Sequence, residues 1–363
     1  MDAVVIRSYD DGPALEALTI DEPRAGEVLV ALAASGVCGS DIHAAHGQSN
    51  AGVLPMVAGH EGSGVVEAVG PGVESVTRGD HVVLGAYGPC YECDACRHGR
   101  FVHCTGEARV NAIRGLMPDG TTRVRSERGA VHPFVGIGSL AEFAVLREAQ
   151  VVKIPDDVAL DVMALAGCGV TTGLGAVFNI AEVGPGDRVL VVGCGGVGLN
   201  VIQGARLAGA ATVVAADTNP ARLNLAADFG ATHLVDPTET AIVDAVATIV
   251  PGGVDVAFEV VGNPTLVAEA FELTRAGGTC VMVGAPPPGS TIPVPASSLM
   301  LGERRLVGCL GGATCRIATS HESWSSIEAA ASSSTSSSAS ACHSPTSRAR
   351  SATPRPARSP AAS

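Results

Sequence analysis

The chain has 363 residues and a formal net charge of −13, and 46% of its residues are hydrophobic. This length exceeds the usual size of one hydrophobic core, so we expect two domains. The negative charge argues against nucleic acid as a partner, because a phosphate backbone requires a basic surface. The chain start has no signal-peptide pattern and no apolar run is long enough to span a bilayer, so we expect a cytoplasmic protein without a membrane partner.

Residues 1 to about 170 read as short β segments separated by glycine-rich turns. Gly64–Gly70 and Asp80–Leu84 are two examples. This pattern predicts a partly open β-barrel rather than a helical domain.

Four chemically active side chains follow the apolar run 28–34 within six residues: Cys38, Ser40, Asp41 and His43. Taken alone, a buried small thiol and a surface histidine explain this stretch equally well. His60, in the segment 59–62, and Cys168, between two glycines, extend the set. Two thiolates and one imidazole would suit a catalytic zinc, which keeps its fourth position open for water or substrate.

Cys90, Cys93, Cys96 and Cys104 have the spacing Cys-x2-Cys-x2-Cys-x7-Cys on a loop rich in glycine and charge. Four thiolates on one loop suit a closed tetrahedral zinc site that fixes the loop. An iron-sulfur or redox role is the next alternative, but nothing else in the sequence supports electron transfer. The remaining cysteines are expected to be reduced core thiols rather than disulfides.

From about residue 171 the pattern changes to alternating strands and helices, which predicts a doubly wound parallel sheet. Strands are expected at 188–192, 212–217, 254–259 and 279–283. Beyond Cys315 the composition shifts to Ser, Ala, Pro and Arg, and disorder is expected there.

A dinucleotide fingerprint follows the first of these strands, with Gly193, Gly195 and Gly198 opening a helix. These glycines permit a tight turn, close approach of the pyrophosphate, and close packing of helix on strand. Asp217, at the end of the next strand, would accept from the adenosine ribose hydroxyls and repel a 2′-phosphate, so NAD is favoured over NADP. Arg222 could approach the same ribose, and its charge makes that preference less than absolute.

With the candidate zinc ligands followed by the dinucleotide fingerprint, residues 1 to about 312 resemble the zinc-dependent medium-chain alcohol dehydrogenases. The likeness is closest to the dimeric branch that includes glutathione- or mycothiol-dependent formaldehyde dehydrogenases. The segments 117–121, 132–136 and 167–173 carry that closer resemblance. The family implies an α/β protein with a GroES-like β-barrel catalytic domain at 1–170, a doubly wound parallel Rossmann domain at 171–312, and an atypical tail at 313–363.

The resemblance also implies roles for individual residues. Cys38, His60 and Cys168 would hold the catalytic zinc. Glu61 would be an alternate ligand, and Asp41 would orient His60 from behind the metal. Zinc would lower the pKa of a bound alcohol, hydride would pass to NAD, and the proton would leave through Ser40, the nicotinamide ribose and His43.

Further positions are implied for the cofactor, the substrate and the partner subunit. Phe134, Val135 and Ala285 match the substrate and nicotinamide pocket, and Val283 is a further candidate cofactor-binding residue. Leu299 to Leu310 resembles the edge through which two subunits pair. The expected assembly is a homodimer with two zincs and NAD per chain, acting on a small alcohol or aldehyde.

Two departures from the family pattern leave alternatives open. The Cys38 to Asp41 segment also resembles polyol and secondary-alcohol dehydrogenases, although those usually place Glu where this chain has Cys168. The tail replaces the helix and strands that complete the catalytic domain in relatives. We hypothesise a frameshift near codon 316, which resequencing the gene would test.

Four functions therefore compete. The leading one is oxidation of primary or secondary alcohols with zinc and NAD. The second is oxidation of a thiol-formaldehyde adduct. A non-catalytic relic is the third, favoured by the tail but opposed by the intact ligands. A zinc-free quinone or enoyl reductase is disfavoured for the same reason.

Overall fold

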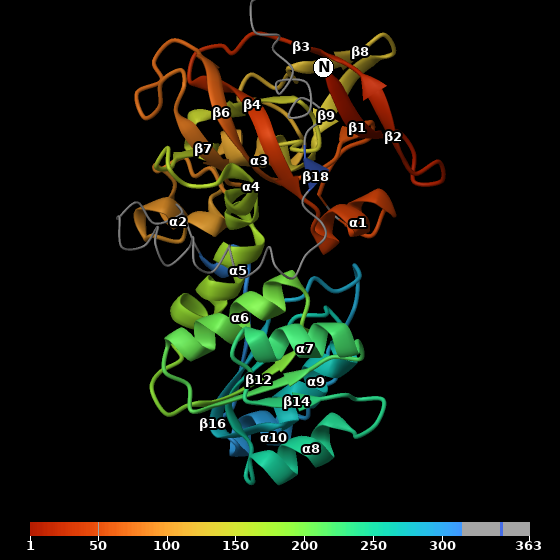
Figure 1. The fold of residues 1–363 in the computed structure, drawn as a ribbon, viewed down its shortest axis with the longest axis vertical. Coiled ribbons are helices and arrows are strands. Elements are labelled where there is room, and N and C mark those ends of the chain that lie inside the picture. The colour runs from red at the N-terminus through yellow and green to blue at the C-terminus, as the bar shows by residue number, and fades with distance from the viewer. Residues whose placement is uncertain (50, 314–341, 344–363) are drawn as a thin grey trace, which may run out of the picture.

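The computed structural model describes residues 1–49, 51–313 and 342–343. A strand-rich part built from the N-terminal half of the chain lies above a part in which helices flank a sheet (Figure 1). The predicted combination of a β-barrel-like part and a doubly wound parallel sheet is confirmed.

Two six-stranded sheets form the N-terminal part. The first has the order β2-β1-β5-β9-β8-β3 and contains β1 (Asp2–Ile6), β2 (Pro13–Ala17), β3 (Thr19–Ile20), β5 (Met56–Val57), β8 (Val124–Ser126) and β9 (Gly129–Pro133). The second has the path β10-β4-β6-β7-β11, with β18 beside β4, and contains β4 (Glu27–Gly36), β6 (Glu61–Val69), β7 (His81–Leu84), β10 (Phe143–Arg147), β11 (Val151–Lys153) and β18 (Cys342–His343).

Strand β4 connects the barrel core to the site. Val28, Val30 and Leu32 alternate along it and point into the core, as the two-residue period of a strand requires. At its far end Gly36 pairs with Glu61, the first residue of antiparallel β6. This register brings the residues that follow β4 next to those that precede β6.

Short helices connect the strands of the N-terminal part and lead to the C-terminal part. They are α1 (Gly39–Ala45), α2 (Asp94–Arg97), α3 (Glu107–Ile113), α4 (Leu160–Met163) and α5 (Gly169–Gly175), with 3-10 turns η1 (Phe101–His103), η2 (Phe134–Gly136), η3 (Glu148–Gln150) and η4 (Ala164–Gly167), and the π-helical η5 (Ala176–Ala181). The proposed domain boundary at 170/171 falls within α5, which packs against α6 of the C-terminal part.

The third sheet is entirely parallel and has the order β14-β13-β12-β15-β16-β17. Its strands are β12 (Arg188–Val192), β13 (Thr212–Ala216), β14 (His233–Val235), β15 (Val254–Glu259), β16 (Thr274–Met282) and β17 (Arg305–Gly308). In chain order this is 3-2-1-4-5-6, the dinucleotide-binding arrangement, whose direction reverses between β12 and β15.

Helices cover both faces of this sheet. They are α6 (Gly196–Leu207), α7 (Pro220–Asp228), α8 (Ile242–Ile249), α9 (Pro264–Glu272) and α10 (Ala296–Leu301), followed by the short η6 (Gly311–Ala313). Along β12, Val189 and Val191 pack toward α6 and α7, whereas Leu190 and Val192 pack toward α8 and α9. The long apolar run of this strand therefore reflects burial on both faces.

Most of the predicted disordered tail, including the hypothesised frameshift site at 316, lies outside the described residues. Within the tail, β18 pairs antiparallel with Ala34 and Ser35 of β4. Among the described residues no single helix is long and apolar enough to cross a membrane, although the bent pair Leu160–Gly167 and Gly169–Ala181 meets the length and composition requirement.

Candidate active site and metal centres

Cys38 starts helix α1 and is held there by Asp41. The Cys38 N–H donates to Asp41 Oδ2 at 2.9 Å, which closes a capping box at the helix start. The other oxygen, Asp41 Oδ1, lies 2.9 Å from Nδ1 of His60. Because both side chains are only 6% exposed, one carboxylate fixes the direction of the His60 ring and leaves its Nε2 free to act as a ligand.

Four potential ligands converge at this point, although they come from distant parts of the sequence. The donor atoms of Cys38, His60, Glu61 and Cys168 all lie within 4.8 Å of one another. Cys168 precedes α5, and the adjacent Gly169 N–H donates to Glu61 Oε1 at 3.1 Å. Two thiols, an imidazole and a carboxylate form a donor set that suits Zn²⁺.

The cluster shifts the acid strength of its own members. Hydrogen bonds from Cys168 and His60 lower the pKa of the Cys38 thiol to about 3, and the resulting thiolate helps to raise the pKa of Cys168. Burial, followed by the Cys38 charge, raises the pKa of Glu61 to about 8. Burial opposes the charged form of His60, but hydrogen bonds to Asp41 and Cys38 hold its pKa well above the usual value.

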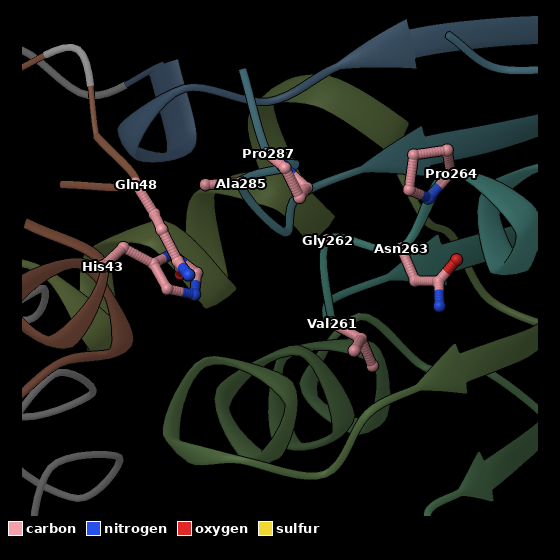
Figure 2. A pocket seen from close by; sticks show the side chains of 8 residues that line it. All are labelled: His43, Gln48, Val261, Gly262, Asn263, Pro264, Ala285 and Pro287. Carbon is pink, nitrogen blue, oxygen red and sulfur yellow. The ribbon is translucent and has the colours of Figure 1, made fainter. Parts of the chain in front are cut away.

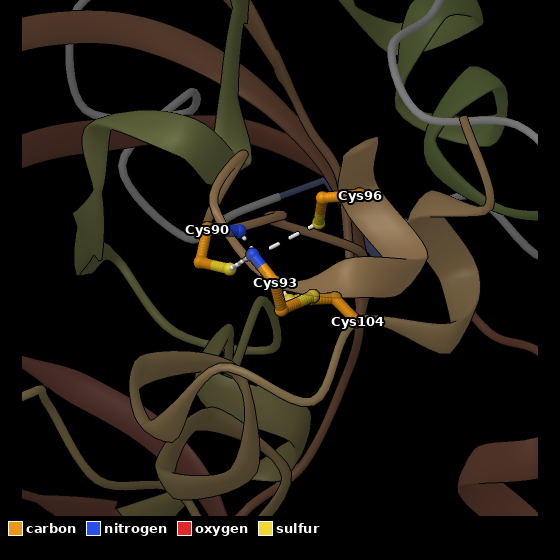
Figure 3. Close-up of side chains that lie close together, drawn as sticks. All are labelled: Cys90, Cys93, Cys96 and Cys104. Atoms are coloured by element: carbon orange, nitrogen blue, oxygen red, sulfur yellow. Dashed lines mark hydrogen bonds between the residues drawn. The ribbon is translucent and has the colours of Figure 1, made fainter. Parts of the chain in front are cut away.

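The second cluster gathers Cys90, Cys93, Cys96 and Cys104 around one point (Figure 3). The Sγ atoms of Cys90 and Cys96 are 3.9 Å apart, as are those of Cys93 and Cys104. Zinc-sulfur bonds of about 2.3 Å in a tetrahedron place sulfurs about 3.8 Å apart, so this cage fits the ion. A hydrogen bond from the Thr105 backbone leads the contacts that lower the pKa of Cys93 to about 5, whereas burial raises that of Cys96 to about 12.

Two buried arginines lie near this cage. Arg147 donates from Nη2 to the Gly88 carbonyl at 3.0 Å, and burial lowers its pKa to about 10. Arg109 lies over the Tyr87 ring at 5.3 Å, and burial likewise lowers its pKa. The negative charge of Cys90 and Cys104 favours the charged form of Arg147. The cysteine thiolates and the arginine guanidiniums therefore stabilise each other's charge.

The predicted fingerprint forms the turn between β12 and α6. Gly193 has φ +97°, which favours glycine, and a Cβ on Gly198 would lie 1.9 Å from the Gly193 carbonyl oxygen. Gly195 caps α6 and has nothing within 4 Å of its Cβ position. The helix start is therefore open to an anionic ligand on the side where the backbone amides point.

Asp217 follows β13 and binds the fingerprint turn. Its Oδ2 accepts from the Cys194 N–H at 2.8 Å, and its Oδ1 accepts from the Asn219 N–H at 2.8 Å. Nη1 of Arg222 lies 3.8 Å from Asp217 Oδ2. The two predicted ribose-side residues are thus neighbours, with the carboxylate fixed and the guanidinium half exposed.

A cavity of about 290 Å³ lies between α1 and the loops that follow β15 and β16. His43 projects into it opposite Ala285 and Pro287, and its remaining lining residues are Gln48, Val261, Gly262, Asn263 and Pro264 (Figure 2). A second cavity of about 160 Å³ joins Cys38 and Glu61 to Gly196 and Val197 at the start of α6. The thiol cluster and the fingerprint helix therefore face one space.

Some predicted residues lie apart from these cavities. Phe134 is buried and packs edge-on against the His60 ring, with 5.5 Å between ring centroids. Val135 packs at the edge of the barrel core. Val283 packs against the core on the face of the third sheet that α6 and α7 cover. Ser40 is half-buried, and its Oγ is 3.9 Å from Cys38 Sγ.

Sequence reasoning missed two residues that shape the site. Gly36 leaves room for Glu61, because a Cβ there would lie 2.0 Å from Glu61 Oε2. Glu259 is fully buried at the end of β15 and binds the loop that lines the larger cavity. An acid ending a central parallel strand just before Gly and Asn is the signal that could have identified Glu259.

A parallel sheet with a dinucleotide turn, facing a thiol-imidazole cluster across a cleft, defines a metal-using nicotinamide oxidoreductase. Comparisons with known proteins identify the family. Residues 24–156 match the alcohol dehydrogenase GroES-like domain, and residues 196–330 match the zinc-binding dehydrogenase model. The chain is 39% identical over 310 residues to S-(hydroxymethyl)glutathione dehydrogenase of Escherichia coli O139:H28, with 84% of each chain covered.

Solved structures agree with this assignment. An alcohol dehydrogenase zinc-binding domain protein from Burkholderia ambifaria has 36% identity and a TM-score of 0.83, covering 91% of this chain and 87% of that one. Benzyl alcohol dehydrogenase from Acinetobacter calcoaceticus has 34% identity and a TM-score of 0.81, with 86% and 85% covered. The chain belongs to the zinc-dependent medium-chain alcohol dehydrogenase family. It is an oxidoreductase that transfers a hydride from an alcohol to NAD, with zinc as its metal.

Proposed function

We propose that Cys38, His60 and Cys168 hold the catalytic zinc, with Glu61 as an alternate ligand and Asp41 as the group that orients His60. The observation that carries this proposal is the convergence of the donor atoms of Cys38, His60, Glu61 and Cys168 within 4.8 Å of one another. Cys38 and Glu61 of this group also line a cavity that reaches the start of α6. Cys90, Cys93, Cys96 and Cys104 would hold a second, structural zinc that fixes their loop.

When bound, zinc supplies Lewis-acid polarisation of the alcohol oxygen, and NAD accepts the hydride. The chain's own contribution is to place and remove a proton. Ser40 lies beside Cys38, where its Oγ can accept the proton of the alcohol. His43, three residues along α1, projects into the larger cavity and can pass that proton onward.

The cofactor site is proposed to run along the carboxyl ends of β13, β12 and β15. Gly193, Gly195 and Gly198 would accommodate the pyrophosphate, and Val283 would lie behind the nicotinamide. Asp217, already fixed by two backbone amides, would accept from the ribose hydroxyls and repel a 2′-phosphate. Arg222, 3.8 Å from that carboxylate, tempers the preference for NAD.

The substrate is proposed to be a small primary or secondary alcohol, or the corresponding aldehyde in reverse. A second candidate is a thiol-formaldehyde adduct, favoured by the 39% identity with S-(hydroxymethyl)glutathione dehydrogenase. The likeness to benzyl alcohol dehydrogenase favours a thiol-independent alcohol instead.

The experiment that tests this function measures zinc per chain together with NADH formation from a panel of alcohols, with and without added thiol cofactors. We expect two zincs per chain and turnover. Turnover of formaldehyde only with a thiol would select the second candidate. One zinc or none, without turnover, would instead support an inactive relic whose catalytic domain does not form with the altered tail.

The assembly and location are proposed separately. We propose a homodimer joined through β17, which ends the parallel sheet, and through the exposed Met300 and Leu301 of α10. A cytoplasmic location is proposed because both metal clusters need reduced thiols, and the nine cysteines between Cys38 and Cys309 are free. The domain limits 1–170, 171–312 and 313–363 are proposed on the same basis as the family assignment.

A further inference from the structure

Glu259 is a buried acid whose carboxylate accepts hydrogen bonds from the backbone of the loop that follows it. Its Oε1 accepts from the N–H groups of Val261, Gly262 and Asn263 at 2.9–3.1 Å, and its Oε2 accepts from Gly262 at 3.0 Å. The residue is 0% exposed. A carboxylate in this position is expensive to bury and is retained only where its acceptors are used.

The same residue also fixes the neighbouring loop through its main chain. The Glu259 carbonyl accepts from the N–H groups of Val283 and Gly284 at 2.8 and 3.0 Å. The two loops then touch closely, because a Cβ on Gly262 would lie 2.4 Å from the Ala285 carbonyl oxygen. Glu259 therefore binds both loops that line the larger cavity. Figure 2 shows the residues of these two loops around the cavity.

This cavity lies where the nicotinamide end of a dinucleotide belongs. The strand order reverses between β12 and β15, and ligands bind at that switch point, beyond the carboxyl ends of the strands. Asp217 marks the adenosine side at β13, so the β15 side is left for the other end. His43, on α1, closes the cavity from the opposite part of the molecule.

We propose that Glu259 is a positioning residue for the cofactor, holding the 261–264 and 283–287 loops in the shape that receives the nicotinamide half of NAD. This inference rests on the proposed function of the cleft. Glu259 touches no reacting atom; it acts through the amides it organises, so the free protein already carries the bound-state loop shape.

The test replaces Glu259 with Gln, which keeps the size and one acceptor oxygen. It removes the negative charge on which the three backbone N–H groups converge, and it turns an NH₂ group toward the Gly262 N–H. We expect E259Q to bind NADH about tenfold more weakly and to raise the KM for NAD, because the loop amides then donate to a neutral acceptor and the Gly262 N–H loses its contact with Oε2. The KM for the alcohol at saturating NAD should change less than about twofold. The NADH affinity of E259D, which retains the charge on a shorter side chain, should lie between those of the unmodified protein and E259Q.

The control is Asp255→Asn at the opposite end of the same strand. Asp255 binds Arg188 and Arg275 and lies far from the loops. D255N should lower the melting temperature but leave NADH affinity unchanged. If E259Q behaves like D255N, losing stability without losing NADH affinity, Glu259 is merely structural and the proposal is overturned.

Hydrogen exchange on the unmodified protein keeps the test independent of folding defects. The peptide containing Val261, Gly262 and Asn263 should be protected before any cofactor is added. Rapid exchange there, suppressed only by NADH, would overturn the proposal, since the loop would then not be preformed. If the unmodified protein does not bind NADH at all, the proposed function fails. The exchange measurement without cofactor is independent of that outcome.

Discussion

Asp41 uses its two oxygens for two different contacts, accepting from the Cys38 N–H and from the His60 ring. An asparagine in its place would keep one acceptor and turn an NH₂ group toward the other donor, so either the α1 cap or the ring orientation is lost. We expect D41N to lower kcat/KM and zinc affinity about 10–100-fold. Metal analysis and kinetics would check this, with D228N on exposed α7 as the control; equal zinc and activity in D41N would contradict it.

Gly36 and Gly39 form a matched pair at the same site. A Cβ on Gly36 would collide with Glu61 Oε2 at 2.0 Å and with Leu165 at 2.9 Å, whereas nothing lies within 4 Å of a Cβ on Gly39. Glu61 cannot easily retreat, since Gly169 binds its other oxygen. We expect G36A to cost about 1–3 kcal/mol of unfolding free energy and G39A less than about 1 kcal/mol. Denaturant titration would measure both; equal costs would show that Glu61 moves freely.

At this scale the sequence predicted which cysteine and histidine side chains come together better than it predicted what surrounds them. Cys38, Asp41 and His60 were recognisable because zinc chemistry restricts the residue types and the resemblance supplies the pairing across the chain. Gly36 and Glu259 were not recognised, because neither spacing nor periodicity shows that a side chain folds back onto a neighbouring backbone. Phe134 packs against the His60 ring, a contact that depends on where η2 turns, and its expected place in the substrate pocket stays a prediction.

At the scale of elements, the loop from Cys90 to Cys104 contains only α2 and η1, so little besides the four thiols stabilises it. Loss of the zinc would also leave Arg109 and Arg147 buried beside thiols that no longer need to be charged. We expect C93S to lose one zinc per chain and to lower the melting temperature by about 5 °C or more. C309S, outside both clusters, is the control, and an unchanged zinc content in C93S would refute the site.

The start of β15 has a charge network that makes stability depend on pH. Burial alone would raise the pKa of Asp255, but the Arg188 and Arg275 guanidiniums hold it well below its usual range. A depressed folded-state pKa gives stability that is present above the unfolded value, about 3.9, and is lost as the pH falls through the folded value. We therefore expect the unmodified protein to lose more stability than D255N between about pH 5 and pH 3, measured by thermal unfolding. Parallel curves would contradict this.

Strands were predictable from the sequence where burial on both faces of the sheet leaves a continuous apolar run. The runs at 188–192 and 254–259 are apolar throughout because helices cover both faces of a parallel sheet, and the fingerprint turn after β12 is marked by its glycines. The barrel was harder, since β3, β5 and β8 are only two or three residues long and are defined by pairing across the chain rather than by local pattern.

For the whole molecule, the cleft between the two parts brings residues 38, 60 and 168 to the start of α6, and no local pattern could have supplied that arrangement. It depends on β4 pairing with β6 in the register Gly36 to Glu61, and on α5 packing against α6. The site is thus a property of the joined parts, so we expect a change at the cleft to affect metal and cofactor together.

The proposed dimer is tested by its exposed apolar residues. Met300 and Leu301 are 70% and 76% exposed on α10, just before the edge strand β17. A charge placed there would oppose association, because pairing would bury it without a partner. We expect the unmodified chain, 36.3 kDa, to sediment at about twice that mass and L301E to sediment as a monomer. L15E, on the equally exposed β2 of the barrel part, should remain dimeric. One substitution acts twice, because a closed two-fold contact uses the same surface on both copies. A dimeric L301E would place the interface elsewhere, and a monomeric parent chain would reject the dimer.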